Sequence, residues 1–106
     1  YREVLENVDA DSRPLAAYNL ACSFSMRAQN EPGEARRHRE IAIRYLEFAV
    51  RSGFVDWPWI EQDRDLDAIR GERGYAELLA SLQREYPDQR RGDVKKEIDE
   101  ILTGGK

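Results

Sequence analysis

Two amphipathic stretches of similar length, separated by a turn sequence, constrain the fold of this chain most strongly. Across residues 15–30, small and apolar residues recur at i, i+3, i+4 and i+7, the spacing of one face of an α-helix. Residues 34–52 repeat this pattern, and the Asn-Glu-Pro-Gly sequence at 30–33 is typical of a turn. Two helices joined by a tight turn bury their apolar stripes by packing antiparallel. The sequence therefore predicts a helical hairpin over residues 11–53.

The remainder of the chain also favours helix. Charged residues make up 36% of the sequence, glycine and proline are few, and no useful length alternates apolar with polar residues. Gly53 stands where a left-handed helix C-cap belongs, so the second long helix is expected to end there. We expect short helices over residues 54–88, followed by a C-terminal helix and tail over 89–106. The predicted fold class is all-α.

The length of 106 residues fits one domain. Residues 1–10 read as the end of a preceding helix and begin without Met, which predicts a fragment of a longer protein. No apolar run approaches the roughly 18–20 residues that span a bilayer, and the single Cys22 cannot form an internal disulfide. These features predict a soluble chain, with the compartment unknown and the cytoplasm slightly favoured.

The formal net charge of −4 arises in one segment. Residues 54–72 hold two basic and six acidic side chains, whereas the rest of the chain is balanced. Nucleic-acid binding and polybasic membrane binding are not expected, because each needs a net basic face. Within the acidic segment, two tryptophans and two aspartates form a predicted interaction patch for a basic partner: Trp57, Trp59, Asp65 and Asp67. The alternative interpretation is that these side chains pack in the core or cap short helices.

Candidate catalytic and metal-binding patterns do not satisfy the requirements of their chemistry. The aspartates at 63, 65 and 67 match the start of a calcium loop, but Ala68 and Gly74 stand where that loop needs Gly and Glu. Cys22 and His38 lack an obvious third group to orient a base. The sequence thus predicts no enzyme activity, no catalytic residue, no metal site and no cofactor.

Residues 15–82 resemble the tetratricopeptide repeat family. The first helix carries Leu20-Ala21 with Phe24, and the second carries small and large residues at the family spacing, Ala42, Leu46 and Ala49. Downstream, the chain is similar to the terminal unit that closes such arrays in many bacterial proteins. That similarity is carried by a Gly-Phe turn at 53–54, Asp-x-Asp-Leu-Asp-x-Ile-Arg at 63–70 and Tyr-x-x-Leu-Leu at 75–79.

This resemblance implies the end of an α-solenoid that binds a protein or peptide partner through a helical groove. Carried over by position, the groove is lined by residues of the first helix, Leu15, Tyr18, Asn19, Cys22, Ser25 and Met26. A purely structural end-cap or self-association domain is the alternative, in which the chain forms homo-oligomers or packs against missing repeats. A metal-dependent or enzymatic domain is a third, less favoured interpretation.

Overall fold

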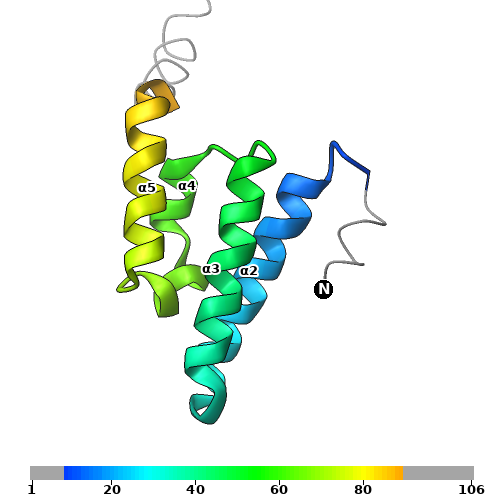
Figure 1. Cartoon of the computed structure of the whole chain (residues 1–106), viewed down its shortest axis with the longest axis vertical. Helices are drawn as coiled ribbons and strands as arrows, with labels where there is room; N and C mark the ends of the chain where they lie inside the picture. Colours follow the sequence, from blue (N-terminus) through cyan, green and yellow to red (C-terminus); the bar gives the residue numbers. More distant parts are fainter. Residues whose placement is uncertain (1–8, 90–106) are drawn as a thin grey trace, which may run out of the picture.

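The computed structural model describes residues 9–89, and within this range every regular element is helical. Two long helices, α2 (Arg13–Asn30) and α3 (Ala35–Arg51), are joined by a single 3₁₀ turn, η1 (Pro32–Glu34). Figure 1 shows α2 and α3 running antiparallel side by side. The all-α class is confirmed, while the helices expected over 1–10 and within 89–106 fall largely outside the described residues.

Alanines hold the two hairpin helices close together. Ala17 and Ala21 on α2, and Ala42 and Ala49 on α3, are all completely buried. Small side chains at these positions let the helix axes approach, so that larger side chains beside them can interlock. The small residues that recur along the sequence therefore form the contact surface between the two helices.

The hairpin ends at a glycine in a left-handed conformation. Gly53 has φ of 120°, which L side chains rarely adopt. Its N–H donates to the carbonyl of Val50, and the N–H of Phe54 donates to the carbonyl of Ala49. These two bonds form a Schellman motif, which satisfies carbonyls at the end of α3. The chain then reverses into the next element.

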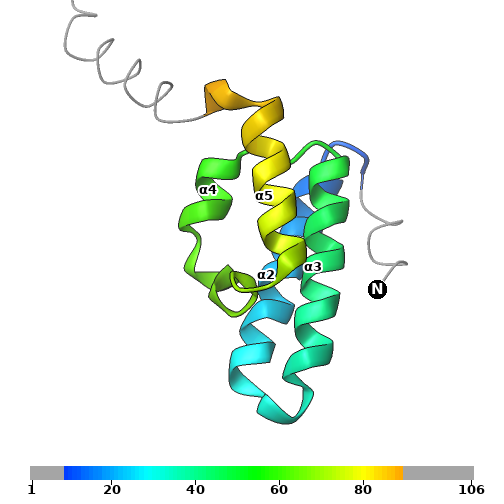
Figure 2. The ribbon, with the colours of Figure 1, turned by 60° about the vertical axis from the view of Figure 1, so that its left-hand side comes forward.

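Residues 54–89, here called the terminal unit, fold into four short or medium helices. They are α4 (Trp57–Gln62), η2 (Arg64–Ile69), α5 (Arg73–Glu85) and η3 (Pro87–Gln89). Asp56 caps α4, with Oδ1 accepting from the N–H of Trp59 at 3.2 Å. Asp63 caps η2 in the same way through the N–H of Asp65. Figure 2 shows α4 and η2 beside α5, with the hairpin next to them.

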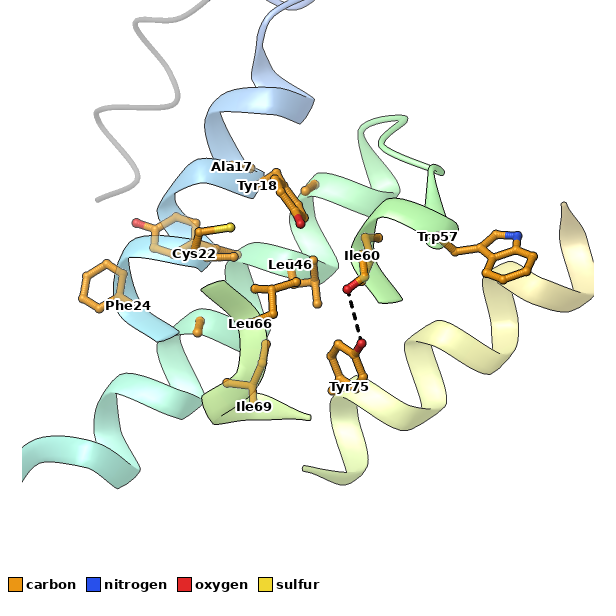
Figure 3. Close-up of a cluster of buried hydrophobic side chains, with 14 of the residues drawn as sticks. Ala17, Tyr18, Cys22, Phe24, Leu46, Trp57, Ile60, Leu66, Ile69 and Tyr75 are labelled. Carbon is orange, nitrogen blue, oxygen red and sulfur yellow. Dashed lines mark hydrogen bonds between the residues drawn. The ribbon is translucent and has the colours of Figure 1, made fainter. Parts of the chain in front are cut away.

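The terminal unit covers one side of the hairpin and completes the core. Element η2 packs against α2 and α3, and α5 packs against α3 and α4. Figure 3 shows Leu66 and Ile69 of η2 directed toward Leu46 of α3, with Ile60 of α4 close by, and all four are at most 1% exposed. Burying such side chains contributes about 1.5–3 kcal/mol each.

Helix α5 approaches α3 through a glycine. A Cβ atom at Gly74, in the first turn of α5, would lie 2.9 Å from Cγ2 of Ile43. That distance is shorter than a carbon contact tolerates, so the two helices meet at a point where only hydrogen fits.

Candidate functional site

Part of the face of α2 that was predicted to bind a partner is in contact with the chain's own terminal unit. The hydroxyl of Tyr18 donates to Oδ2 of Asp63 at 2.5 Å, and Sγ of Cys22 lies 3.7 Å from the same oxygen. The other carboxylate oxygen, Oδ1, accepts from the N–H of Asp65 at 3.0 Å. The ring of Tyr18 also stacks on Phe54, with 4.2 Å between centroids and 5° between planes.

Both α2 groups at this contact are held in their neutral forms. Burial, followed by the hydrogen bond to Asp63, raises the pKa of Tyr18 well above its usual range. Burial and the nearby charges of Asp63 and Asp65 raise the pKa of Cys22 to about 12. The Cys22 thiol is therefore protonated at neutral pH, whereas nucleophilic attack and metal ligation require the thiolate.

Among the described residues, three side chains of the types that bind metal ions lie close together. The candidate ligand atoms of Cys22, Asp63 and Asp65 lie within 4.8 Å of one another. Metal binding there would have to displace the thiol proton and compete with the hydroxyl of Tyr18 for Asp63. In the structure, the Asp63 carboxylate accepts hydrogen bonds instead, and these bonds join α2 to the terminal unit.

Arg70 joins several parts of the terminal unit through exposed and partly buried hydrogen bonds, a role that the sequence interpretation missed. Its guanidinium donates to the backbone carbonyl of Asp63 at 2.6 Å, to the hydroxyl of Tyr75 at 2.7 Å and to Oδ1 of Asp67 at 2.8 Å. Burial alone would lower the pKa of Arg70, but the bond to Asp67 and nearby charges raise it overall. The hydroxyl of Tyr75 also lies 3.4 Å from the carbonyl of Ile60. The signal was present, since Arg70 ends the Asp-x-Asp-Leu-Asp-x-Ile-Arg pattern.

The six predicted groove residues separate into two sets. Tyr18, Cys22 and Ser25 are buried, with exposed fractions of 3%, 6% and 0%. Tyr18 and Cys22 do not line an open groove, because both contact Asp63 of the terminal unit. Leu15 and Met26 are exposed by 57% and 37%, and Asn19 is also exposed.

The predicted aromatic patch separates in the same manner. Trp57 is buried, and its indole Nε1 donates to the carbonyl of Tyr86 at 2.8 Å. Trp59, two residues later, is 54% exposed. Asp65 is exposed, while Asp67 forms an ion pair with Arg70. Trp57 is therefore a packing residue, and Trp59, Asp65 and Asp67 are the members that face solvent.

Cys22 and His38, weighed in the sequence as a catalytic pair, have different neighbours. Nε2 of His38 lies 3.5 Å from Oε1 of Glu31 beside the hairpin turn, and its ring packs against Phe24. Cys22 instead contacts Asp63, in the terminal unit. These contacts give the two side chains no partner in common.

None of the helices between residues 9 and 89 combines the length and apolar character needed to cross a membrane.

Comparison with known proteins gives one distant similarity. Over 94 aligned residues the chain is 29% identical to a protein from Arabidopsis thaliana that is described as chloroplastic. The alignment covers 81% of this chain and 25% of that protein, so the chain spans about a quarter of the length of the relative it matches. No protein-family model and no solved structure matches the chain.

Proposed function

We propose that this chain is a non-catalytic protein–protein interaction module of tetratricopeptide type, which binds a protein or peptide partner through the outer face of α2. The observation that carries the proposal is an exposed row of three residues, here called the α2 stripe: Leu15, Asn19 and Met26. The rest of the predicted groove is buried, so this stripe is the part of it that a partner can reach.

The α2 stripe has the geometry of a small docking surface. At 100° and 1.5 Å per residue, its members fall within about 40° of one another and span about 16 Å along the helix. Leu15 and Met26 offer apolar area at the ends, and the flexible thioether of Met adapts to different partners. Asn19 lies between them and can both donate and accept hydrogen bonds, as an extended backbone requires.

A structural role is the second candidate, favoured by the way the terminal unit closes one side of the hairpin. A helical array needs an end that covers its last apolar face. In this interpretation the α2 stripe packs against further helices of a longer protein or against a second copy of the chain. Both candidates use the same surface and differ in what occupies it.

Site-specific photo-cross-linking tests the proposal. A photoreactive phenylalanine analogue placed at position 15 or 26 should form an adduct with the same second protein from both sites. Arg36, whose side chain is 89% exposed on α3, provides the matched control position. Adducts with a second copy of the chain would support the structural candidate. Absence of adducts, or equal adducts from position 36, would contradict the proposal.

A substitution then separates binding from folding. Asn19→Ala removes both hydrogen-bonding groups of an exposed side chain, and we expect the melting temperature to stay within about 2 °C of the original. Binding of the cross-linked partner should fall, measured by isothermal titration calorimetry. Unchanged affinity for Asn19→Ala would show that the amide takes no part in recognition.

A further inference from the structure

A second surface lies on the outer side of α3 and combines arginines with an exposed aromatic ring. Arg37, Arg44 and Arg51 are exposed and follow one another at seven-residue intervals. Phe48 is exposed by 40% and stands one turn after Arg44. At 100° per residue, the four side chains fall within about 60° of one another on the helix. They are called the α3 arginine face below.

The surface at the C-terminal half of this face is hollowed. A shallow, open depression of about 230 Å³ is lined by Arg44, Glu47, Phe48 and Arg51. An exposed large apolar side chain beside a hollow is a site at which a partner's side chain can bury apolar area. The depression belongs to α3 and is separate from the contacts of Tyr18 and Asp63.

The charges of the arginine face are incompletely compensated. Among the described residues, neither Arg37 nor Arg44 forms an ion pair. Arg51 lies 3.3 Å from Glu47, but its side chain is 78% exposed, and such surface pairs contribute little. Helix α3 holds five arginines and two glutamates, whereas the chain as a whole carries a net charge of −4.

We propose that the α3 arginine face docks an acidic amphipathic helix of a partner protein. Arginines seven residues apart are about 10.5 Å apart along α3, which matches carboxylates repeated every seven residues on a second helix. Each guanidinium can bind a carboxylate through two parallel hydrogen bonds. An apolar side chain of the partner then fills the hollow beside Phe48.

The pattern favours an acidic protein segment over a nucleic acid. Glu40 and Glu47 border the arginine row on one side, so a continuous line of phosphates along the helix would meet both of them. Separate carboxylates that face only the arginines avoid this repulsion. This proposal uses a different helix from the α2 stripe and does not depend on the proposed function.

The test measures binding of a synthetic peptide to the full chain by fluorescence anisotropy at low ionic strength. The probe is a fluorescein-labelled helical peptide with Glu at every seventh position and Leu four residues after each Glu. Its control has Gln in place of Glu. We expect saturable binding of the Glu peptide, at least tenfold weaker binding of the Gln peptide, and loss of affinity as salt is added.

Variants of the protein locate the site. Arg44→Glu should weaken binding of the Glu peptide by about tenfold or more, and Phe48→Ala by about fivefold. Arg36→Glu is the matched control, because it makes the same charge change on α3 away from the hollow, and it should stay within about twofold. All three substitutions are at exposed positions, and circular dichroism checks that each variant remains helical.

Three outcomes would overturn the proposal. One is the absence of saturable binding by the unmodified chain up to about 1 mM peptide. Another is an equal loss of affinity in Arg36→Glu and Arg44→Glu, which would show general charge attraction only. The third is tighter binding of a labelled single-stranded oligonucleotide than of the Glu peptide, which would assign the face to nucleic acid.

Discussion

The hydroxyl of Tyr18 donates a hydrogen bond to the carboxylate of Asp63, which lies 45 positions later in the sequence. This bond joins the first helix of the hairpin to the junction between α4 and η2. Because the same carboxylate also caps η2 through the N–H of Asp65, the start of η2 is fixed relative to α2. This contact lies on the side of the hairpin that the terminal unit covers.

Removal of the Tyr18 hydroxyl is expected to destabilise the protein measurably. Tyr18→Phe keeps the ring stacked on Phe54 but leaves the Asp63 carboxylate without that donor. The free energy of unfolding should fall by about 1.5–3 kcal/mol, the usual contribution of a hydrogen bond to a charged group. Urea denaturation measures it. Tyr86→Phe, at an exposed ring, is the control and should change stability by less than about 0.5 kcal/mol.

The contact between α5 and α3 can be tested by adding one methyl group. Gly74→Ala places a Cβ 2.9 Å from Cγ2 of Ile43, so the Ile43 side chain or α5 must shift, at a cost of about 1–3 kcal/mol. Gly71→Ala meets nothing within 4 Å and serves as the control.

A double variant identifies the cause of that loss. Ile43→Ala removes the opposing methyl group, so Gly74→Ala should cost less in an Ile43→Ala background than in the original protein. Thermal unfolding of the four proteins gives the coupling energy. Strictly additive losses would contradict a direct clash between these two positions.

The two tryptophans should behave oppositely, although they are two residues apart. Trp59→Ala is expected to reduce stability by less than about 1 kcal/mol, because Trp59 is 54% exposed. Trp57→Ala should cost about 3–5 kcal/mol, since it empties a core site and removes the hydrogen bond to Tyr86. Acrylamide should quench the fluorescence of the unmodified protein strongly and that of Trp59→Phe weakly. Equal quenching of both proteins would contradict the assigned burial.

Stability should decline in alkaline solution. The pKa of Cys22 is raised from 9.0 to about 12, so above about pH 9 the unfolded chain loses this proton while the folded chain retains it. The unfolded state then binds fewer protons, and stability that is complete below pH 9 is lost as the pH rises toward 12. The raised pKa values of Tyr18 and Tyr75 act in the same direction.

The alkaline decline can be divided among these groups. Urea midpoints for the unmodified chain and Cys22→Ala, measured from about pH 7 to pH 11, should converge with rising pH because the variant lacks the thiol contribution. Tyr18→Phe should likewise flatten the curve above about pH 10. A stability that is constant or increases over this interval would show that these groups are not buried as described.

Helical periodicity predicted the hairpin closely. The expected helix over 15–30 is observed as Arg13–Asn30, and the one over 34–52 as Ala35–Arg51. Gly53 was predicted correctly as the left-handed C-cap, because a residue in the left-handed conformation at a helix end is usually glycine. Such features depend on neighbours within a few positions, so a single sequence contains the information.

The exposure of individual side chains could not be predicted in the same way. Tyr18 is buried because residues more than 30 positions later, Phe54 and Asp63, pack on it, and its own helix carries no sign of that contact. Helix α4 has only six residues, which is less than two turns. So short a helix shows no periodic pattern that would reveal which of Trp57 and Trp59 faces inward. The resemblance to a repeat family supplied candidate positions but not the side on which the terminal unit lies.

The hydrogen bonds of Asp63 and Arg70 have a consequence for folding cooperativity. From Tyr18 through Asp63 and Arg70 to Tyr75, side chains and backbone groups link α2, η2 and α5 without a gap. A region that opens alone would have to break this series and leave partly buried polar groups unsatisfied. Amide protons in the hairpin and in α5 should therefore exchange with solvent through one shared opening event, so that the terminal unit does not unfold independently of the helices it covers.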